Sequence, residues 1–365
     1  MTQRPRNSTN FHLRAQRHGP AGLISRVADC CMWFGRYLER AESIARQLQA
    51  TSSLALDAEL PPTRCWHPLV VVAGEEAHFK ERFGEAFGDG ERVQHFLVWD
   101  DRCWVSLFRT VAAARENARS IREVLSGDVW ETVNELYVWM QNEGPEGGPA
   151  VYRARRDDFY RRVRQMTQLA LGLMRSTMLH DTALDFIWLG VMLERTNQTA
   201  RLLDVHHHAF GGEVGAGATE VHDATAPGAL NHQVVETAVW VSLLRACSGF
   251  EPFVKSFAGR VTPAAVAHFL VTDARFPRSV TYSLHAAYER FSYLRPPSDG
   301  DLPGGESLAM LARLDKWIAN LPPSLPDLHA ILTQIVDETA RIGETIGREL
   351  LGYEPTPSVA SSPEG

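Results

Sequence analysis

The chain has 365 residues, 44% hydrophobic and 22% charged, with a formal net charge of −7 and a pI near 6.1. This acidic balance argues against a nucleic-acid-binding protein, whose binding domain is usually basic. No apolar run approaches the roughly 18 residues of a membrane-spanning helix, so we expect no membrane association. Five cysteines, an odd number without C-x-x-C spacing, fit free thiols and predict a cytoplasmic protein.

The two ends of the chain are expected to be disordered tails. Residues 1–22 are polar and lack the apolar stretch of a secretory signal. Residues 353–365 form the second expected tail, and the single domain is expected to span residues 23–352. Within it, the glycine- and alanine-rich stretch at 211–228 predicts a mobile loop.

The domain opens with a segment that returns 155 residues later. Residues 33–48 and 188–203 agree at eight of sixteen positions, in the pattern W-x-G-x-x-L-E-R-x-x-x-x-A-R-x-L. A second shared string, H-F-L-V-x-D, begins at His95 and again at His268. Such self-similarity predicts a tandem duplication. The two pseudo-equivalent units are predicted at residues 24–125 and 182–295.

Each copy of the first repeat has helical periodicity. At about 100° per residue, its apolar positions form one arc and a polar stripe lies beside that arc. A glycine costs about 1 kcal/mol in a helix interior, so the glycine in each stripe predicts close approach of another backbone. The stripes of the two copies contain Gly35, Glu39, Glu42 and Arg46, and Gly190, Glu194, Asn197 and Arg201.

The charges of these stripes need partners. A carboxylate and a guanidinium beside a close helix contact favour a partly buried ion pair over a solvated one. In the first copy Glu42 can serve Arg46, four residues along the helix. Arg201 has no such neighbour, because Asn197 stands where the first copy has Glu42.

Two carboxylates remain open as partners for Arg201. Asp204 can supply one at the surface, three residues along the same helix. If the two glycine faces cross, Glu39 can supply one from the other helix, and Glu194 can return the contact to Arg46. The arginines that directly follow the two glutamates are expected on another side of each helix: Arg40 and Arg195.

Helical patterns continue through the rest of the domain. Further helices are predicted at about 104–126, 130–140, 151–178 and 325–350. Only Leu69–Ala73 looks strand-like, and it is too isolated to make a sheet. We therefore predict an all-α fold, a helical bundle built from two tandem pseudo-equivalent units plus a C-terminal helix.

These motifs resemble the alpha-E family, bacterial all-helical proteins named for a glutamate–arginine motif. The likeness covers roughly residues 23 to 350. The family often has a second arginine after the glycine, whereas the second copy here has Val191. The residues that carry the likeness are Ser25–Asp29, Trp33–Glu42, Ala114–Arg119, Asn134–Tyr137, Ser176–Met178, Leu202–Val205 and Phe276–Val280.

The resemblance also implies partners. Alpha-E proteins resemble components of operons that include ATP-grasp ligase-like and transglutaminase-like proteins. That company implies an accessory or scaffold component of a peptide- or amide-ligation system. The alternative is an enzyme whose glutamate–arginine stripes line a cleft and act on an amine or carboxylate substrate. The two interpretations differ in whether the stripes face a solvent-reachable pocket or are sealed between helices.

Other candidate chemistry is weak. Three neighbouring histidines on a helix point about 100° apart and cannot easily share one metal ion. Glu75 and His78 form a single Glu-x-x-His, whereas a di-iron bundle needs two. No phosphate-binding loop or nucleophile elbow occurs, so we expect neither metal nor cofactor and assign no catalytic residue. The neighbouring histidines are His206, His207 and His208.

A stripe of arginines is predicted on the helix at 104–126. Arg115, Arg119 and Arg122 lie on one face of that helix, with glutamates between them. The stripe is either an ordinary solvated face or a docking surface for an acidic partner.

Overall fold

The computed structural model describes residues 23–57, 60–144, 152, 154–216, 227–257, 260–296 and 302–353. The expected tail at 1–22, nearly all of that at 353–365, and residues 217–226 of the expected loop lie outside these ranges. The flanking parts of that loop belong to helices, so the helical pattern runs further there than its glycine content predicts.

Every long regular element in the described ranges is a helix, which confirms the all-α prediction. The first half comprises α1 (Ser25–Asp57), α2 (Pro62–Ala73), α3 (Glu76–Phe83), α4 (Gly90–Trp99), α5 (Leu107–Ser120), α6 (Gly127–Glu143) and α8 (Arg156–Thr177). The second comprises α9 (Thr182–Ala216), α10 (Pro227–Ala246), α11 (Phe250–Ser256), α12 (Pro263–Thr272), α13 (Val280–Leu294), α14 (Gly305–Ala319) and α15 (Leu328–Ile346), followed by a short π-helix (Gly347–Leu351).

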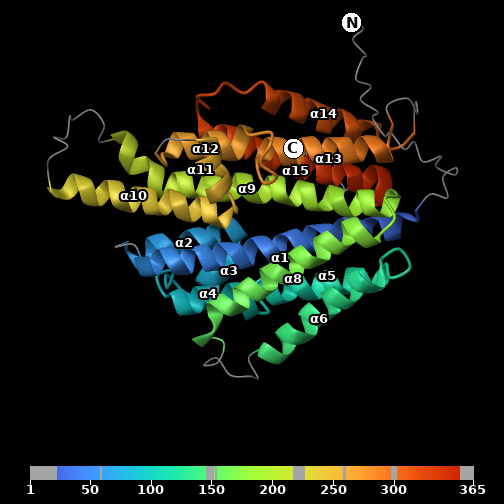
Figure 1. Ribbon diagram of the computed structural model, residues 1–365, viewed down its shortest axis with the longest axis horizontal. Helices are drawn as coiled ribbons and strands as arrows, with labels where there is room; N and C mark the ends of the chain where they lie inside the picture. Colours follow the sequence, from blue (N-terminus) through green and yellow to red (C-terminus); the bar gives the residue numbers. More distant parts are fainter. Residues whose placement is uncertain are drawn as a thin grey trace, which may run out of the picture.

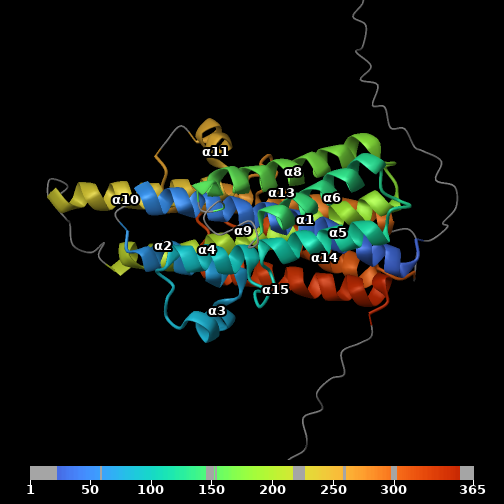
Figure 2. The same cartoon turned by 90° about the horizontal axis from the view of Figure 1, so that it is seen from below.

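The packing of the first half is repeated in the second. Helix α1 packs on α5 and α8, and α9 packs in the same way on α13 and α15. The two long helices α1 and α9 lie side by side at the centre, between the first half and the second half (Figure 1). Figure 2 shows the same arrangement from below. The similarity thus reaches beyond the predicted units at 24–125 and 182–295, because α15, predicted as an added C-terminal helix, has α8 as its counterpart.

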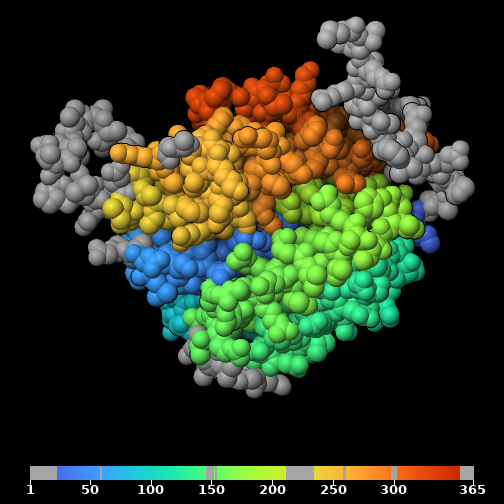
Figure 3. Space-filling model, viewed as in Figure 1, coloured from blue at the N-terminus to red at the C-terminus, as the bar shows by residue number. Residues whose placement is uncertain are grey.

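The two halves also exchange helices. Helix α2 of the first half packs on α9, and α10 of the second half packs on α1. In the space-filling view, the yellow surface of the second half lies directly against the blue surface of the first (Figure 3). Each central helix is therefore covered partly by its own half and partly by the other.

Two glycines set the distance between α1 and α9. A Cβ atom at Gly35 would lie 2.0 Å from the carbonyl oxygen of Ile187, and one at Gly190 would lie 2.0 Å from that of Met32. In each case the carbonyl belongs to the residue three positions before the other glycine, so the two contacts are equivalent. The predicted close approach of backbones at these glycines is confirmed.

Two local predictions were wrong. The segment Leu69–Ala73, rich in β-branched residues, lies inside α2. Proline at its first position starts this helix, and Gly74, with a φ of 74°, ends it. Helix α5 ends at Ser120 and not near residue 126, so the chain turns again before Ser126 caps α6.

The last described residue, Tyr353, belongs to the packed structure although the sequence placed it in a tail. Its hydroxyl donates to the Asp29 carboxylate at 2.5 Å and accepts from Trp33 Nε1 at 2.9 Å. The chain thereby returns to the start of α1. None of the helices in the described ranges combines enough length with enough apolar character to cross a bilayer.

Candidate functional site

The glutamate–arginine pairs of α1 and α9 bind each other across the helix contact. Glu39 accepts two hydrogen bonds from Arg195, Nε at 3.0 Å and Nη2 at 2.7 Å. Glu194 accepts two from Arg40, Nε at 2.7 Å and Nη2 at 3.0 Å. Both glutamates are at most 1% exposed. The two bidentate pairs are equivalent contacts, each joining the motif of one half to that of the other.

A buried reciprocal network was predicted, but with the wrong arginines. The sequence paired the glutamates with Arg46 and Arg201, and expected Arg40 and Arg195 to point elsewhere. Because α1 and α9 approach so closely at the glycines, the long side chain after each glutamate reaches the facing helix even from a neighbouring angle on its own helix. Helical periodicity gives the direction of each Cβ atom, but it does not show how far the arginine side chain extends from that atom.

Each glutamate has a further arginine, and here the two halves differ. Glu194 also accepts from Arg36 Nε at 3.1 Å. The counterpart of Arg36 is Val191, which carries no charge. Glu39 instead accepts from Arg278 Nη1 at 2.7 Å, and this arginine comes from the turn before α13. Sequence reasoning missed Arg278, although the string Phe276–Val280 contributed to the family resemblance.

Arg278 also closes the network on the Glu39 side. Its Nη2 donates to the Glu42 carboxylate at 2.6 Å, and Glu42 accepts a further short hydrogen bond from Arg46. Glu42 is fully buried. Burial lowers the pKa of Arg46 to about 9, and the nearby positive charge of Arg278 adds to this effect.

On the Glu194 side, other residues stand where Glu42 and Arg278 complete the network around Glu39. Asn197 stands at the place of Glu42, and Val105 at the place of Arg278, since both follow the aspartate of the H-F-L-V-x-D string by five residues. Within the described ranges Arg201, the counterpart of Arg46, makes no hydrogen bond and no ion pair. Neither predicted carboxylate reaches it.

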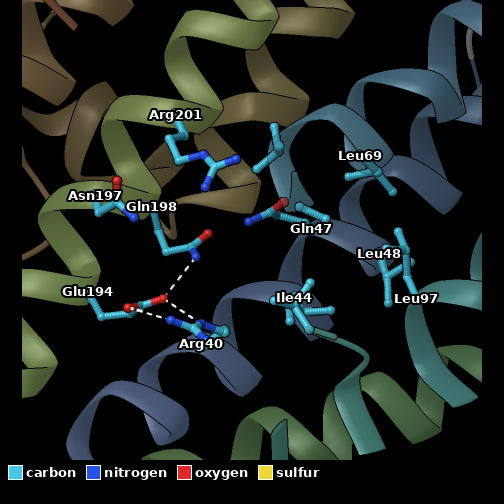
Figure 4. A pocket seen from close by; sticks show the side chains of 13 residues that line it. Arg40, Ile44, Gln47, Leu48, Leu69, Leu97, Glu194, Asn197, Gln198 and Arg201 are labelled. Atoms are coloured by element: carbon cyan, nitrogen blue, oxygen red, sulfur yellow. Dashed lines mark hydrogen bonds and ion pairs between the residues drawn. The ribbon is translucent and has the colours of Figure 1, made fainter. Parts of the chain in front are cut away.

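A cavity of about 120 Å³ lies where these residues are missing (Figure 4). The Arg201 guanidinium points into it from α9, and Gln47 faces it from α1. Burial lowers the pKa of Arg201; the nearby Glu194 charge opposes this lowering without cancelling it, and Arg40 adds to it. The lining comprises Arg40, Ile44, Gln47, Leu48, Leu69, Val72, Ala73, Leu97, Val105, Glu194, Asn197, Gln198 and Arg201.

The two buried glutamates are held ionised. Burial alone would raise the pKa of Glu39, but Arg195 and Arg278 outweigh it and lower the pKa to about 2. In the same way Arg40 and Arg36 overcome burial at Glu194 and lower its pKa to about 2. Neither carboxylate is available to take up a proton near neutral pH.

The predicted surface partner of Arg201 is engaged elsewhere. Asp204 Oδ1 lies 2.8 Å from His329 Nδ1, which lies 2.8 Å from His208 Nε2. These are the only three described residues whose histidine, cysteine or carboxylate atoms group closely enough to hold a metal ion, all within 4.8 Å of one another. His206 points away and is buried, with its ring Nδ1 3.0 Å from the Leu202 carbonyl oxygen.

A second cavity, of about 370 Å³, lies beside Arg46 and shares no lining residue with the first. Its charged lining is mostly basic, with Arg164 and Arg245 against a single Glu251. The Nε atoms of Arg46 and Arg164 are buried without a hydrogen-bond partner. This side of the network therefore carries excess positive charge and suits anions.

The predicted arginine stripe is only partly free. Arg115 donates to Asn134 at 2.9 Å and lies over the ring of Tyr137, so it belongs to the packing of α5 on α6. Arg119 pairs with Glu116 at the surface, and Arg122, beyond the end of α5, lies over the Trp130 ring. The stripe is mainly a paired, solvated face, and its role in docking stays a prediction.

Comparison with known proteins identifies the family but no activity. At 23% identity over 342 residues, the chain is similar to Uncharacterized protein Rv2567 of Mycobacterium tuberculosis and Uncharacterized protein Mb2597 of Mycobacterium bovis. The match covers 86% of this chain but only 36% of these relatives. No solved structure matches the chain. The family model described as "a predicted alpha-helical domain with a conserved ER motif" matches residues 23–351, and the chain belongs to this Alpha-E family.

Proposed function

We propose that the protein is a binding component of a peptide- or amide-ligation system and does not itself catalyse the reaction. The observation that carries this proposal is that the two glutamates of the repeated motif are fully engaged in ion pairs with arginines. Each is buried and held by at least two arginines, with a pKa of about 2. Carboxylates held in this way suit a structural role, and a pKa so far below neutral pH makes them weak general bases.

The cavity beside Arg201 supports binding more than catalysis. Among the described residues, its lining contains no cysteine, serine, histidine, lysine or tyrosine, and Glu194 is the only carboxylate there. It does contain apolar walls with a few polar groups, which is typical of ligand sites. An enzyme acting on an amine or carboxylate substrate remains the second candidate, because this cleft is lined by Arg40, Arg201 and Glu194.

The partners we propose are ATP-grasp ligase-like and transglutaminase-like proteins, acting with this chain in the cytoplasm. The family resemblance supports these partners, and the described cysteines, all without disulfides, fit that compartment. The chain spans about a third of the length of the curated relatives it matches. The relatives therefore carry further segments beyond the part that this chain matches.

The test is purification of the tagged chain from its host under mild conditions, followed by identification of co-purifying proteins. We expect an ATP-dependent ligase among them, and we expect that ligase to form more amide product when the chain is added back. Arg341→Gln, an exposed change on α15 outside both the cavity and the arginine stripe of α5, serves as the control variant. Product formation by the chain alone, or a ligase indifferent to the chain, would overturn the proposal.

A further inference from the structure

We propose that the cavity beside Arg201 binds the carboxylate of a peptide ligand in the position that the Glu42 carboxylate occupies in the other half. The carboxylate chemistry follows from the internal repeat. The identification of its source as a peptide rests on the function proposed above.

The first step is the equivalence of the two sides. The backbone contacts at Gly35 and Gly190 match, and so do the bidentate pairs that join Glu39 to Arg195 and Glu194 to Arg40. Arg201 therefore stands to Glu194 as Arg46 stands to Glu39. What surrounds Arg46 shows what a filled site around Arg201 contains.

The second step is the charge balance. The Glu39 side has two carboxylates, and the Glu194 side has one. Each side has three arginines: Arg46, Arg195 and Arg278 on the first, and Arg36, Arg40 and Arg201 on the second. One added carboxylate would give the second side the composition of the first. Arg201 is the arginine that lacks it.

The third step is the space. On the first side Arg278 reaches across and fills the region beside Glu42, whereas on the second Val105 is too short to do so. The resulting 120 Å³ equals roughly four water molecules at about 30 Å³ each, enough for a carboxylate on a short aliphatic chain. The side-chain amides of Gln47 and Asn197 line the cavity beside Arg201 and can donate to the second oxygen.

The apolar lining selects against a free inorganic anion. Ile44, Leu48, Leu69 and Leu97 line the cavity beside the polar groups, and they suit methylene carbons that follow the carboxylate. A C-terminal peptide carboxylate and an aspartate or glutamate side chain both have this form. Their shared chemistry is a carboxylate on an aliphatic stem.

Asn197→Glu tests the site without any ligand. It restores in the second half the i,i+4 carboxylate that Glu42 provides for Arg46. We expect this variant to melt a few degrees higher than the wild type, because it gives the partly buried Arg201 guanidinium the carboxylate partner that it lacks, and to lose carboxylate binding. Asn197→Gln, which adds length without charge, is the matched control and should leave the melting temperature almost unchanged.

Titration with glutarate, and with its neutral diamide at equal ionic strength, tests the ligand class. We expect glutarate alone to raise the melting temperature, and Arg201→Gln to weaken its binding about 10- to 100-fold, the usual effect of removing a hydrogen bond to a charged group. Arg341→Gln, an exposed change outside the cavity, should bind as the wild type does. Equal effects of glutarate and diamide, or unchanged binding by Arg201→Gln, would refute the carboxylate site.

Acetylated dipeptides separate the two peptide sources from each other. One carries a free C-terminal carboxylate and no acidic side chain, and the other carries a glutamate side chain with an amidated C-terminus. Binding of either at the Arg201 site supports a peptide ligand, and binding of neither, with glutarate still bound, refutes it. A ligase that co-purifies with Arg201→Gln while glutarate binding is lost would leave the proposed function intact and assign the cavity to substrate. If no ligase co-purifies with the wild type although glutarate binds normally, the proposed function fails and the carboxylate site stands.

Discussion

Val105 and Arg278 occupy the same position in the two halves of the chain, and Val105 leaves open beside Glu194 the space that Arg278 fills beside Glu42. Arg278 donates to both Glu39 and Glu42, while Val105 lines an open space beside Glu194. Two halves with the same helix packing thus differ beside the shared motif: Arg278 and Glu42 complete the ion pairs around Glu39, whereas a cavity lies at the matching place beside Glu194.

This relationship predicts that the cavity can be closed by design. The double variant Val105→Arg Asn197→Glu copies the Arg278 and Glu42 arrangement into the second half. We expect it to abolish glutarate binding and to raise the melting temperature more than Asn197→Glu alone. Val105→Arg alone adds a fourth arginine without a carboxylate, so it should lower the melting temperature. If the double variant is no more stable than Val105→Arg, the two sides are not equivalent.

The crossed ion pairs are predicted to be strongly coupled. Removing one partner of a buried pair leaves an uncompensated charge and typically costs about 3–5 kcal/mol. We expect Glu39→Ala and Arg195→Ala each to lower the free energy of unfolding by about this amount, and the double variant to cost less than their sum. Denaturant melts measure this cycle. The exposed pair of Glu116 and Arg119 is the control, and its single variants should cost under about 1 kcal/mol.

The two central glycines are predicted to be irreplaceable by alanine. A Cβ at Gly35 or Gly190 would lie 2.0 Å from a backbone oxygen that cannot move without separating α1 from α9. We expect either alanine variant to destabilise the protein by several kcal/mol or to prevent folding. Gly172 is the control, because it is exposed in α8 with nothing within 4 Å of an added Cβ. There alanine should stabilise by up to about 1 kcal/mol. Equal melting temperatures for all three variants would contradict the close contact.

Stability is predicted to fall in mild acid because of His206. Burial lowers the pKa of His206 to about 4 from 6.5, so the unfolded chain takes up this proton before the folded one. The stabilisation is complete above pH 6.5 and is lost as the pH falls towards 4, by about 3 kcal/mol in all. Urea melts at pH 7, 5.5 and 4.5 measure it. His206→Gln should flatten the dependence in this window, and an unchanged slope would show that another group is responsible.

A second loss is predicted at lower pH. The pKa values of Glu39 and Glu194 are about 2, below their usual 4.5, so the unfolded state again binds protons first. Their contribution is present above pH 4.5 and disappears as the pH falls towards 2. His206→Gln should leave this lower window unchanged, whereas Glu39→Gln should reduce it.

The sequence was informative where two copies could be compared. Identity at Gly35 and Gly190, and at the glutamates that follow, correctly predicted a close helix contact and a buried reciprocal network. It could not name the arginines, because helix periodicity describes backbone directions and a flexible guanidinium reaches well beyond them. The repeat of α8 and α15 was missed because their amphipathic patterns can be kept with few identical residues.

The role of Arg278 could not be predicted from the sequence for a different reason. It contacts Glu39 from 239 positions away, and no local pattern connects the two. The departure at Val191 was nevertheless a usable signal. Because Val191 supplies no arginine to Glu39, a second arginine for this glutamate had to come from elsewhere in the chain. The string Phe276–Val280, to which no role had been assigned, contains that arginine.

The exchange of helices between the halves has a consequence for how the chain acquires its structure. During synthesis α1 emerges some 155 residues before the part of α9 that supplies its partner, so Glu39 and Gly35 wait without their contacts. The first half is incomplete at that stage, with a carboxylate that has no arginine from the other half and a helix face that α10 has yet to cover. Only when the second half has been synthesised can it supply the arginine and the covering helix that the first half lacks, so we expect the two halves to become stable together.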